Sequence, residues 1–286
     1  MSGHLFSYGH GYSAAALADL LRPLGWDITG TTRNAEKADA LRQSGMTARV
    51  TPQDSLSADL ATATHLLVSA APNETGDPFL HAHLSDLEAA QNLEWVGYLS
   101  TTGVYGDHGG GWVDETSPLT PATARGKARV AAEAQWRDVA EKLGLNLKIF
   151  RLAGIYGPGR GPFAKVRNGT ARRIIKANQV FSRIHVEDIA QVLLASINQP
   201  QSSQIFNVCD NAAAPPEDVI AYAAELLGMP LPPKQDFETA QMTPMARSFY
   251  AESKKVANDR IKSELNVELA YPDYKSGLKA LLAAES

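Results

Sequence analysis

A short glycine-containing segment near the N-terminus has the residue types and spacing that bind a phosphate. Gly9, His10, Gly11, Tyr12 and Ala14 lie in the run Gly-His-Gly-Tyr-Ser-Ala, a G-x-G-x-x-A pattern. Gly9 permits a tight turn, Gly11 lets the backbone approach a pyrophosphate, and Ala14 lets a helix pack close to a strand. The free N–H groups and partial positive charge of a helix N-terminus favour the anion. The alternative interpretation is a strand–turn–helix connection with two turn glycines.

The residues that end the second predicted strand indicate which dinucleotide is bound. An NAD site commonly has Asp or Glu there, about 20 residues after the glycines, bonded to a ribose hydroxyl. Here the strand ends at Thr32, Arg33 follows it, and no acid stands at that point. We expect Arg33 to bind the 2′-phosphate of NADP by charge-assisted hydrogen bonds, with NAD as the second choice. The other interpretation is a surface arginine that caps a loop.

The elements that must position these residues alternate along the first 155 residues. Predicted strands are His4–Tyr8, Asp27–Thr32, Thr64–Ala70, Trp95–Ser100 and Asn146–Leu152, and predicted helices are Ser13–Leu24, Glu36–Ser44, Pro78–Asn92 and Arg125–Leu143. This βαβα order predicts an α/β fold with a Rossmann-like, doubly wound parallel sheet. Ala70 and Ala71 end the Thr64–Ala70 strand, and these small residues let the adenine and ribose side of a dinucleotide lie close to the backbone.

The pattern loosens after residue 155. We expect an irregular loop at Gly157–Gly161 and a strand at Gln204–Val208, with helices at Glu187–Asn198, Pro215–Leu227, Glu252–Leu265 and Pro272–Ala284. The predicted organisation is an NAD(P)-binding domain over residues 1–155 and a smaller C-terminal α/β substrate-binding domain over residues 156–286. Residues 180–210 are expected to return to the first domain.

Composition excludes several classes of protein. The chain has 286 residues, of which 44% are hydrophobic and 20% charged, so it can form a sizeable core and is not globally disordered. A net charge of −4 gives no basic footprint for nucleic acid. A single cysteine, Cys209, excludes a disulfide framework and indicates a reducing compartment. No apolar stretch is long enough for a membrane span, the N-terminus does not resemble a signal peptide, and a cytoplasmic location is expected. No acid–histidine cluster has the spacing of a metal site.

Five segments carry a resemblance to a known family. They are Ser100–Gly106, Asp114–Pro121, Phe150–Gly159, Arg183–Ala190 and Phe206–Val208. With the glycine run, they resemble the extended short-chain dehydrogenase/reductase family, which includes NAD(P)-dependent sugar epimerases and dehydratases. The resemblance covers nearly the whole chain, although Tyr8 stands where extended members usually have their first glycine. It implies that Thr101 binds the reacting oxygen of a substrate, close to the cofactor.

The resemblance also exposes a chemical departure. The family's Tyr-x-x-x-Lys pair should lie on the helix after Pro121, where this chain has Arg125 and Arg129. A tyrosine can donate and recover a proton, whereas an arginine cannot, because its pKa exceeds ~12. Lys127 does not replace the missing lysine, because it points to a different face of the helix. The chain therefore resembles an atypical subgroup with an altered active site.

Two interpretations of the arginines remain open at this point. In one, Arg129 pairs with Glu133, four residues along the helix, and Arg125 is solvated. In the other, both arginines face the cleft and bind a carboxylate or phosphate. Replacement acids are Tyr105 and His185, each with the alternative of a structural role.

The sequence thus supports two functions. The first is an NAD(P)-binding oxidoreductase or epimerase-like enzyme for a small polar or anionic substrate, with Thr101, Arg125, Arg129 and Tyr105 as candidate catalytic residues. The second is a non-catalytic NADP-binding redox sensor or regulator. The expected partners are the dinucleotide and an unknown small molecule, without nucleic acid or membrane. The resemblance is compatible with a homodimer formed through the Arg125–Leu143 helix.

Overall fold

The computed structural model describes residues 2–73 and 75–285, so Met1 and Ser286, the outer ends of the two expected domains, lie outside the described residues. Its centre is a parallel sheet in the order β11-β7-β5-β4-β1-β2-β3. The strands are β1 (His4–Tyr8), β2 (Asp27–Thr32), β3 (Thr47–Val50), β4 (His65–Val68), β5 (Trp95–Thr101), β7 (Leu147–Leu152) and β11 (Ile205–Val208). The predicted Rossmann-like sheet is confirmed.

Helices cover both faces of this sheet, because its strands are apolar on both faces. Leu5 and Phe6 are neighbours on β1 and contribute to different hydrophobic clusters, as the two-residue period of a strand requires. On the Leu5 face lie α1 (Tyr12–Leu21), α2 (Ala35–Gln43) and α7 (Val186–Asn198). On the Phe6 face lie α3 (Ser57–Thr62), α4 (Pro78–Ala89) and α5 (Ala124–Leu143).

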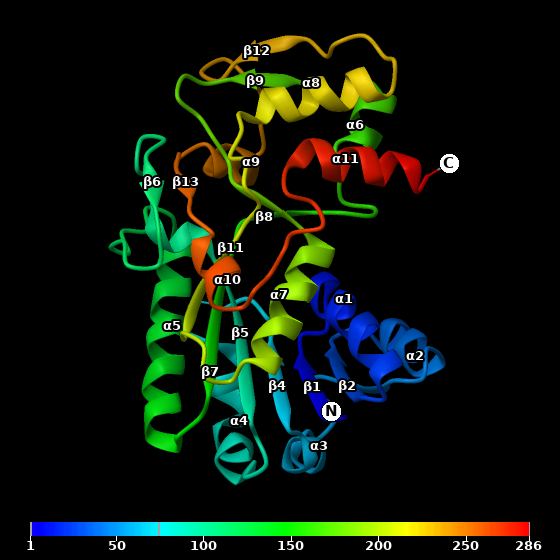
Figure 1. Ribbon diagram of the computed structural model, residues 1–286, viewed down its shortest axis with the longest axis vertical. Coiled ribbons are helices and arrows are strands. Elements are labelled where there is room, and N and C mark those ends of the chain that lie inside the picture. Colours follow the sequence, from blue (N-terminus) through cyan, green and yellow to red (C-terminus); the bar gives the residue numbers. More distant parts are fainter. Residues whose placement is uncertain (1, 74, 286) are drawn as a thin grey trace.

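The C-terminal elements form a smaller layer beyond the carboxyl ends of the strands, at the top of Figure 1. Two short parallel pairs join β10 to β8 and β12 to β9. Its own core packs α6, α8 and α11 together. The elements are β8 (Gly154–Tyr156), α6 (Phe163–Arg167), β9 (Arg173–Ile175), β10 (Arg183–His185), α8 (Pro216–Leu226), β12 (Lys234–Asp236), α9 (Pro244–Phe249) and α11 (Tyr274–Ala283).

The predicted helix Glu252–Leu265 is wrong. The segment instead forms β13 (Lys255–Val256), which pairs with β6 (Trp112–Val113), and a short helix α10 (Asp259–Ser263). Its backbone is held extended by other segments: the N–H of Ser253 donates to Asp107 at 2.7 Å, and the N–H of Val256 donates to Ser182 at 3.1 Å. Tertiary hydrogen bonds have outweighed local helix propensity here.

Other elements agree in kind with the sequence interpretation and shift by a few residues. The first helix, for example, divides into α1 and a 3-10 turn, η1 (Arg22–Leu24), that ends at Gly25 with φ 78°. β3 and α3 lie in a stretch for which the sequence analysis made no prediction. In the described part of the chain, no helix is both long and apolar enough to cross a membrane.

Candidate dinucleotide cleft

The predicted cofactor residues meet along one edge of the sheet. β5, β4, β1 and β2 are successive neighbours and run parallel, so Thr101, Ala70, Gly9 and Arg33 lie at or just beyond their carboxyl ends in a row. With ~4.8 Å between neighbouring strands, the row extends over roughly 14 Å. In open parallel sheets this edge is where ligands bind. Figure 1 shows the C-terminal layer beyond this edge.

The two glycines of the loop are required for different reasons. Gly9 has φ 78°, and a Cβ there would lie 2.9 Å from the backbone nitrogen of Ala70, so the fold itself requires this glycine. A Cβ on Gly11 would meet only the carbonyl oxygen of Gly9, at 3.5 Å. Nothing among the described residues therefore explains Gly11, whereas a pyrophosphate approaching the backbone does.

The N-terminus of α1 is open to an anion. Gly11 is its N-cap residue, and no side chain caps the first N–H groups of this ten-residue helix. Such groups and the helix dipole favour a phosphate at this position. Ala14, in the first turn of α1, is fully buried, which agrees with the expected close packing of this helix on the sheet. The residues present thus fit the pyrophosphate of a dinucleotide.

His10 has a structural role in the glycine loop. Its backbone N–H donates to the carbonyl of Thr31 at 2.8 Å, and its buried ring lies against Gly30, whose added Cβ would be 2.9 Å from the ring. Burial, reinforced by the charge of Lys37, lowers the pKa of His10 to about 4. The ring is therefore neutral at neutral pH and does not offer a positive charge to a phosphate.

Positive charge at this end comes instead from Arg33 and Lys37. Arg33 is exposed directly after β2 and has no hydrogen bond or ion pair within residues 2–73 and 75–285. Lys37, in the first turns of α2, donates to the carbonyl oxygen of His10. Thr32 accepts a hydrogen bond from the N–H of Asn34 at 3.2 Å, so its hydroxyl faces the same turn. Lys37 was not predicted from the sequence, although its place four residues after Arg33 is a usable signal.

Tyr12 connects the glycine loop to the C-terminal layer. Its hydroxyl donates to the carbonyl of Pro158 at 2.9 Å, within the Gly157–Gly161 loop. The guanidinium of Arg160 lies 5.7 Å from the centroid of the Tyr12 ring. This hydrogen bond joins the start of α1 to a loop that is 146 residues away in the sequence.

Thr101 and the start of α5 form the other end of the row. Thr101 is half-buried, and its hydroxyl oxygen accepts from the N–H of Gly103 at 3.2 Å as it caps the 3-10 turn η2 (Thr102–Tyr105). A Cβ on Gly126 would lie 2.8 Å from the carbonyl oxygen of Gly103, so this glycine lets α5 begin directly against η2. The N-terminal turns of α5, including Arg125, thereby lie beside Thr101.

Arg125 is exposed but not simply solvated. Its guanidinium donates to the hydroxyl of Ser248 at 3.1 Å and lies 4.8 Å from the ring centroid of Phe249, both on or beside α9. Helix α9 has no buried residue, and its Met245 and Phe249 are 64% and 54% exposed. Arg125 thus links the Rossmann domain to a lightly packed segment of the C-terminal layer.

Arg129 turns toward the sheet. Its Nη1 donates to the hydroxyl of Tyr98 at 2.9 Å and to the carbonyl of Leu99 at 2.6 Å. The expected alternative of an Arg129–Glu133 pair is wrong, because Glu133 is fully buried and binds Arg151 at 2.8 Å instead. The other part of that alternative, a solvated Arg125, is corrected by the Ser248 contact.

Glu133 and Arg151 belong to a buried polar network that the sequence did not reveal. Ser100 donates to Glu133 at 2.5 Å, and Arg151 donates to the hydroxyl of Tyr105 at 2.9 Å. Tyr105 in turn donates to the side-chain oxygen of Asn207 at 2.6 Å. The network joins β5, α5, β7, η2 and β11 directly behind Thr101.

The two candidate replacement acids are both buried. Tyr105 is fully buried, its hydroxyl is occupied by Arg151 and Asn207, and burial raises its pKa to about 12, with Arg151 opposing that rise. His185 is 1% exposed, and its Nδ1 accepts from the N–H of Glu187 at 3.3 Å at the start of α7. Both placements suit a structural role better than proton transfer to a ligand.

Comparisons with known proteins identify several similar chains. Residues 9–209 match the model of the NAD dependent epimerase/dehydratase family. A solved structure, that of a functionally unknown conserved protein from Silicibacter pomeroyi DSS, is 57% identical, superposes with a TM-score of 0.92, and is matched over 99% of each chain. Protein YeeZ of Escherichia coli (strain K12) is 29% identical over 279 residues, or 93% of this chain and 95% of YeeZ.

A more distant neighbour shows the shared fold. It is the human epimerase family protein SDR39U1 (isoform 2), which was solved with NADPH. The two chains are 18% identical, with a TM-score of 0.74 and coverage of 98% of this chain and 99% of the human one.

Proposed function

Because the chain belongs to the NAD dependent epimerase/dehydratase family, we propose that it binds NADP(H) along the row from Arg33 to Thr101 and acts as an oxidoreductase with an altered active site. Gly11 and the uncapped start of α1 take the pyrophosphate, and the small residues Ala70 and Ala71 leave room for the dinucleotide beside β4. When bound, the nicotinamide donates or accepts a hydride. Thr101 would orient the oxygen on the carbon that exchanges that hydride.

The observation that supports NADP over NAD is the exposed Arg33, which has no hydrogen-bond or ion-pair partner in the described part of the chain. The exposed guanidinium of Arg33, which follows Thr32 and precedes Lys37 by four residues, provides donors and positive charge for a 2′-phosphate. No acid ends β2 to accept a hydrogen bond from a free ribose hydroxyl.

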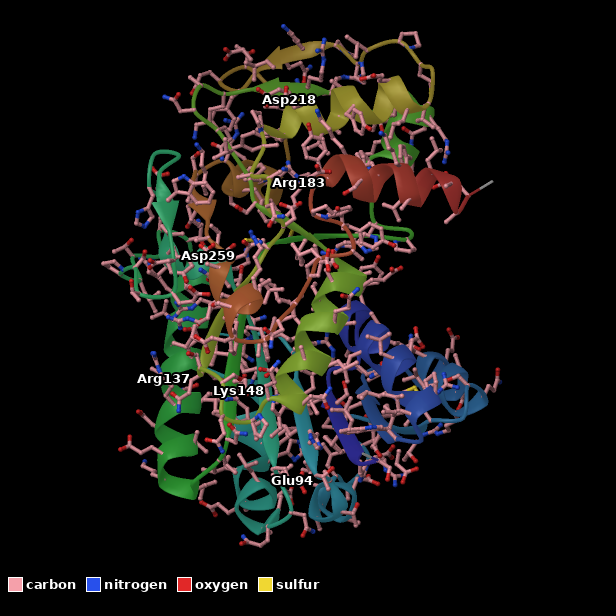
Figure 2. The ribbon with its side chains drawn as sticks, viewed as in Figure 1. Glu94, Arg137, Lys148, Arg183, Asp218 and Asp259 are labelled. Atoms are coloured by element: carbon pink, nitrogen blue, oxygen red, sulfur yellow. The ribbon has the colours of Figure 1, made fainter. Side chains whose placement is uncertain are left out.

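The test compares both cofactors by calorimetric titration. Arg33→Ala should weaken NADP binding about ten- to a hundred-fold, because a hydrogen bond to a charged group contributes roughly 1.5–3 kcal/mol, and should leave NAD binding nearly unchanged. Arg137→Ala is the matched control, since Arg137 is an exposed arginine on α5 (Figure 2). Equal losses for both cofactors would refute the assignment to NADP.

The same geometry supports a small polar or anionic substrate beside Arg125. The guanidinium is exposed, it extends from the helix that begins against η2, and its partner is the neutral hydroxyl of Ser248. A carboxylate or phosphate forms a stronger, charge-assisted bond with arginine than a hydroxyl does. We therefore infer that an anionic ligand replaces Ser248 at Arg125, which also frees α9. Arg129 takes no part in this contact, because its guanidinium is engaged by Tyr98 and Leu99.

A second candidate function, a non-catalytic NADP-binding redox sensor or regulator, is favoured by the absence of a proton relay. Helix α5 contains no tyrosine, and Tyr105 is buried behind Thr101. General acid catalysis typically contributes ~10²–10⁴-fold in rate, so reduction of neutral ketones should be very slow.

Reconstruction of the relay distinguishes the two functions. Arg125→Tyr combined with Arg129→Lys should weaken binding of anionic ligands and should raise NADPH-dependent reduction of neutral carbonyl compounds from a very low level. The measurement is NADPH oxidation over a panel of neutral and acidic carbonyl compounds for the wild type and the double variant. Turnover of acidic compounds by the wild type would support the enzyme, and its absence with all compounds would support the sensor. Fast wild-type turnover of neutral ketones that the double change does not alter would contradict the missing relay.

A further inference from the structure

Helix α9 presents two large apolar side chains beside Arg125. Met245 is 64% exposed and Phe249 is 54% exposed. The two residues are four apart on α9, so they share one face of the helix, which we call the apolar face of α9. The guanidinium of Arg125 lies 4.8 Å from the centroid of the Phe249 ring. The apolar face of α9 is therefore turned toward the start of α5.

The opposite face of α9 is anchored to the C-terminal layer. Arg247 lies two residues from both Met245 and Phe249, and residues two apart point to nearly opposite faces of a helix. The guanidinium of Arg247 donates to the carbonyl of Ala240 at 2.8 Å and lies 4.7 Å from the centroid of the Phe237 ring. These contacts hold α9 in place, so its apolar face stays in water rather than packing into the layer that carries it.

The charges on both sides of the contact suit an anion. Residues 124–132, at the start of α5, include basic residues and no acid, and the same is true of residues 241–251, around α9. The acids that follow these two stretches, Glu133 and Glu252, are each paired with a cation of their own. An anion that approaches Arg125 therefore meets no unpaired carboxylate from either stretch.

A chain of contacts leads from the apolar face of α9 to Thr101. Arg125 immediately precedes Gly126, where a Cβ would lie 2.8 Å from the carbonyl oxygen of Gly103. The N–H of Gly103 donates to the hydroxyl of Thr101 at 3.2 Å. Three contacting segments thus carry Thr101, Arg125 and Phe249. A ligand that contacts Arg125 and Phe249 therefore lies beside the segment that holds the proposed oxygen-binding hydroxyl.

We infer that the ligand at Arg125 is an amphipathic anion, namely a carboxylate attached to an aromatic ring that packs on Phe249 and Met245. The inference rests on the proposed binding of an anion by Arg125, and it adds the chemical class of the rest of the ligand. An aromatic ring packs favourably on a phenyl ring and on a thioether, and the contact removes two exposed apolar side chains from water. Helix α9, released from the bond between Ser248 and Arg125, is then held to α5 through the ligand.

Calorimetric titration of the full chain with three small molecules, with and without NADP, tests the inference. Phenylacetate carries the ring and the charge, acetate carries only the charge, and phenylacetamide carries only the ring. We expect phenylacetate to bind at least about ten-fold more tightly than either of the others, because both the buried ring and the charge-assisted hydrogen bond contribute. Binding is measured rather than turnover, so the result does not depend on whether the protein catalyses a reaction.

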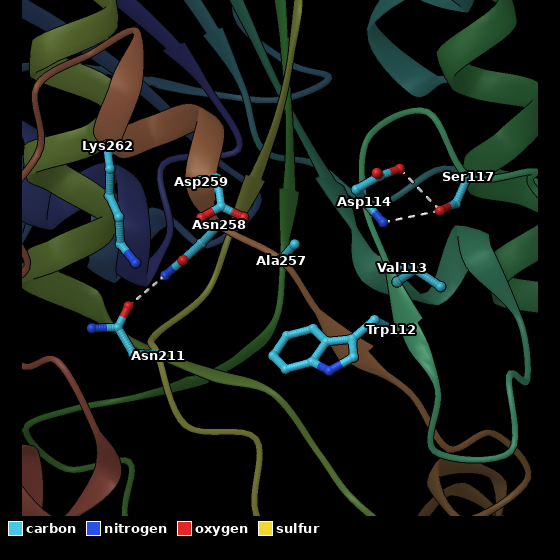
Figure 3. A pocket seen from close by; sticks show the side chains of 9 residues that line it. All are labelled: Trp112, Val113, Asp114, Ser117, Asn211, Ala257, Asn258, Asp259 and Lys262. Atoms are coloured by element: carbon cyan, nitrogen blue, oxygen red, sulfur yellow. Dashed lines mark hydrogen bonds between the residues drawn. The ribbon is translucent and has the colours of Figure 1, made fainter.

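A variant of α9 separates the ring contact from the charge. Phe249→Ala should weaken phenylacetate binding about ten-fold and leave acetate binding nearly unchanged, since only the contact between rings is lost. Trp112→Ala is the matched control, because Trp112 is another exposed aromatic residue, at 63%. It lines a different cavity with Asp259 and Lys262 (Figure 3), and that cavity includes no residue of α5 or α9. This control should bind phenylacetate like the wild type.

Arg125→Gln distinguishes failure of the inference from failure of the anion site. If this change weakens both carboxylates, but phenylacetate binds no more tightly than acetate or Phe249→Ala binds phenylacetate like the wild type, the aromatic ligand is refuted and the anion site stands. If Arg125→Gln binds both carboxylates like the wild type, the anion site and the inference fail together. Phenylacetamide that binds as tightly as phenylacetate, or an equal loss in Trp112→Ala, would also overturn the inference.

Discussion

The two ends of the carboxyl edge differ in where their polar groups are satisfied. At the β1–β2 end, the start of α1 is uncapped by a side chain, Gly11 has no steric reason to be glycine, and Arg33 has no partner among the described residues. At the β5–β7–β11 end, Glu133, Arg151 and Tyr105 bond to one another in the interior. The first end leaves its donors open for a ligand, whereas the buried ion pair of the second end is satisfied within the protein. The residues that stabilise the fold and the residues that are open to a ligand are therefore different ones.

The largest expected effect concerns the start of α1, at the β1–β2 end of the sheet edge. Gly11→Val should abolish dinucleotide binding, because a branched side chain would occupy the space that the pyrophosphate must enter. The fold should survive at a cost of about 1 kcal/mol, since Val is a poorer N-cap residue than Gly and a Cβ meets only the carbonyl of Gly9. Calorimetry and thermal unfolding measure the two effects. Ala82→Val, which adds a branched side chain at an exposed position of α4, is the control. Undiminished affinity in Gly11→Val would place the cofactor elsewhere.

Changes in the buried network of Glu133, Arg151 and Tyr105 should instead affect the stability of the fold. Glu133→Gln leaves Arg151 buried without its carboxylate and should destabilise the protein by about 3–5 kcal/mol, as measured by urea unfolding. Glu141→Gln, at an exposed position of the same helix, should change stability by less than ~0.5 kcal/mol. A Glu133→Leu, Arg151→Met pair should recover much of the loss, because it removes both charges. Similar stabilities for the two single variants would show that the network is not needed for the fold.

The smallest effect depends on pH. Burial lowers the pKa of His10 to about 4 in the folded protein, so between pH 6.5 and about 4 the unfolded chain binds a proton that the folded chain does not. Stability is therefore lost as the pH falls through this range. His10→Phe keeps a ring beside Gly30 without titrating, and its advantage over the wild type should grow to ~3 kcal/mol at pH 4, because each pH unit corresponds to ~1.36 kcal/mol. A difference that is constant between pH 7 and 4 would show that His10 is not buried as a neutral ring.

The same contrast explains what the sequence could predict. The glycine loop, Thr32 and Arg33 are neighbours in the chain or lie one strand apart, so local patterns were sufficient to predict their arrangement. Glu133 and Arg151 meet across 18 residues and two elements, and Tyr105 meets Asn207 across 102 residues. A helix interpretation of Glu252–Leu265 failed for the same reason, since the hydrogen bonds that keep Ser253 and Val256 extended come from Asp107 and Ser182. Contacts of this kind depend on the whole topology, which residue types and spacing do not contain.

The hydrogen bond between Tyr12 and Pro158 would transmit the effect of cofactor binding to a second loop. It fastens the first turn of α1 to the loop that enters the C-terminal layer, and the same loop carries Arg160 over the Tyr12 ring. A ligand that immobilises the start of α1 therefore also restrains the loop that leads to α6. Amide hydrogen exchange should then slow in two places on cofactor addition, at the glycine loop and at Gly157–Gly161. Tyr12→Phe should uncouple the two, leaving slower exchange only where the dinucleotide itself makes contact.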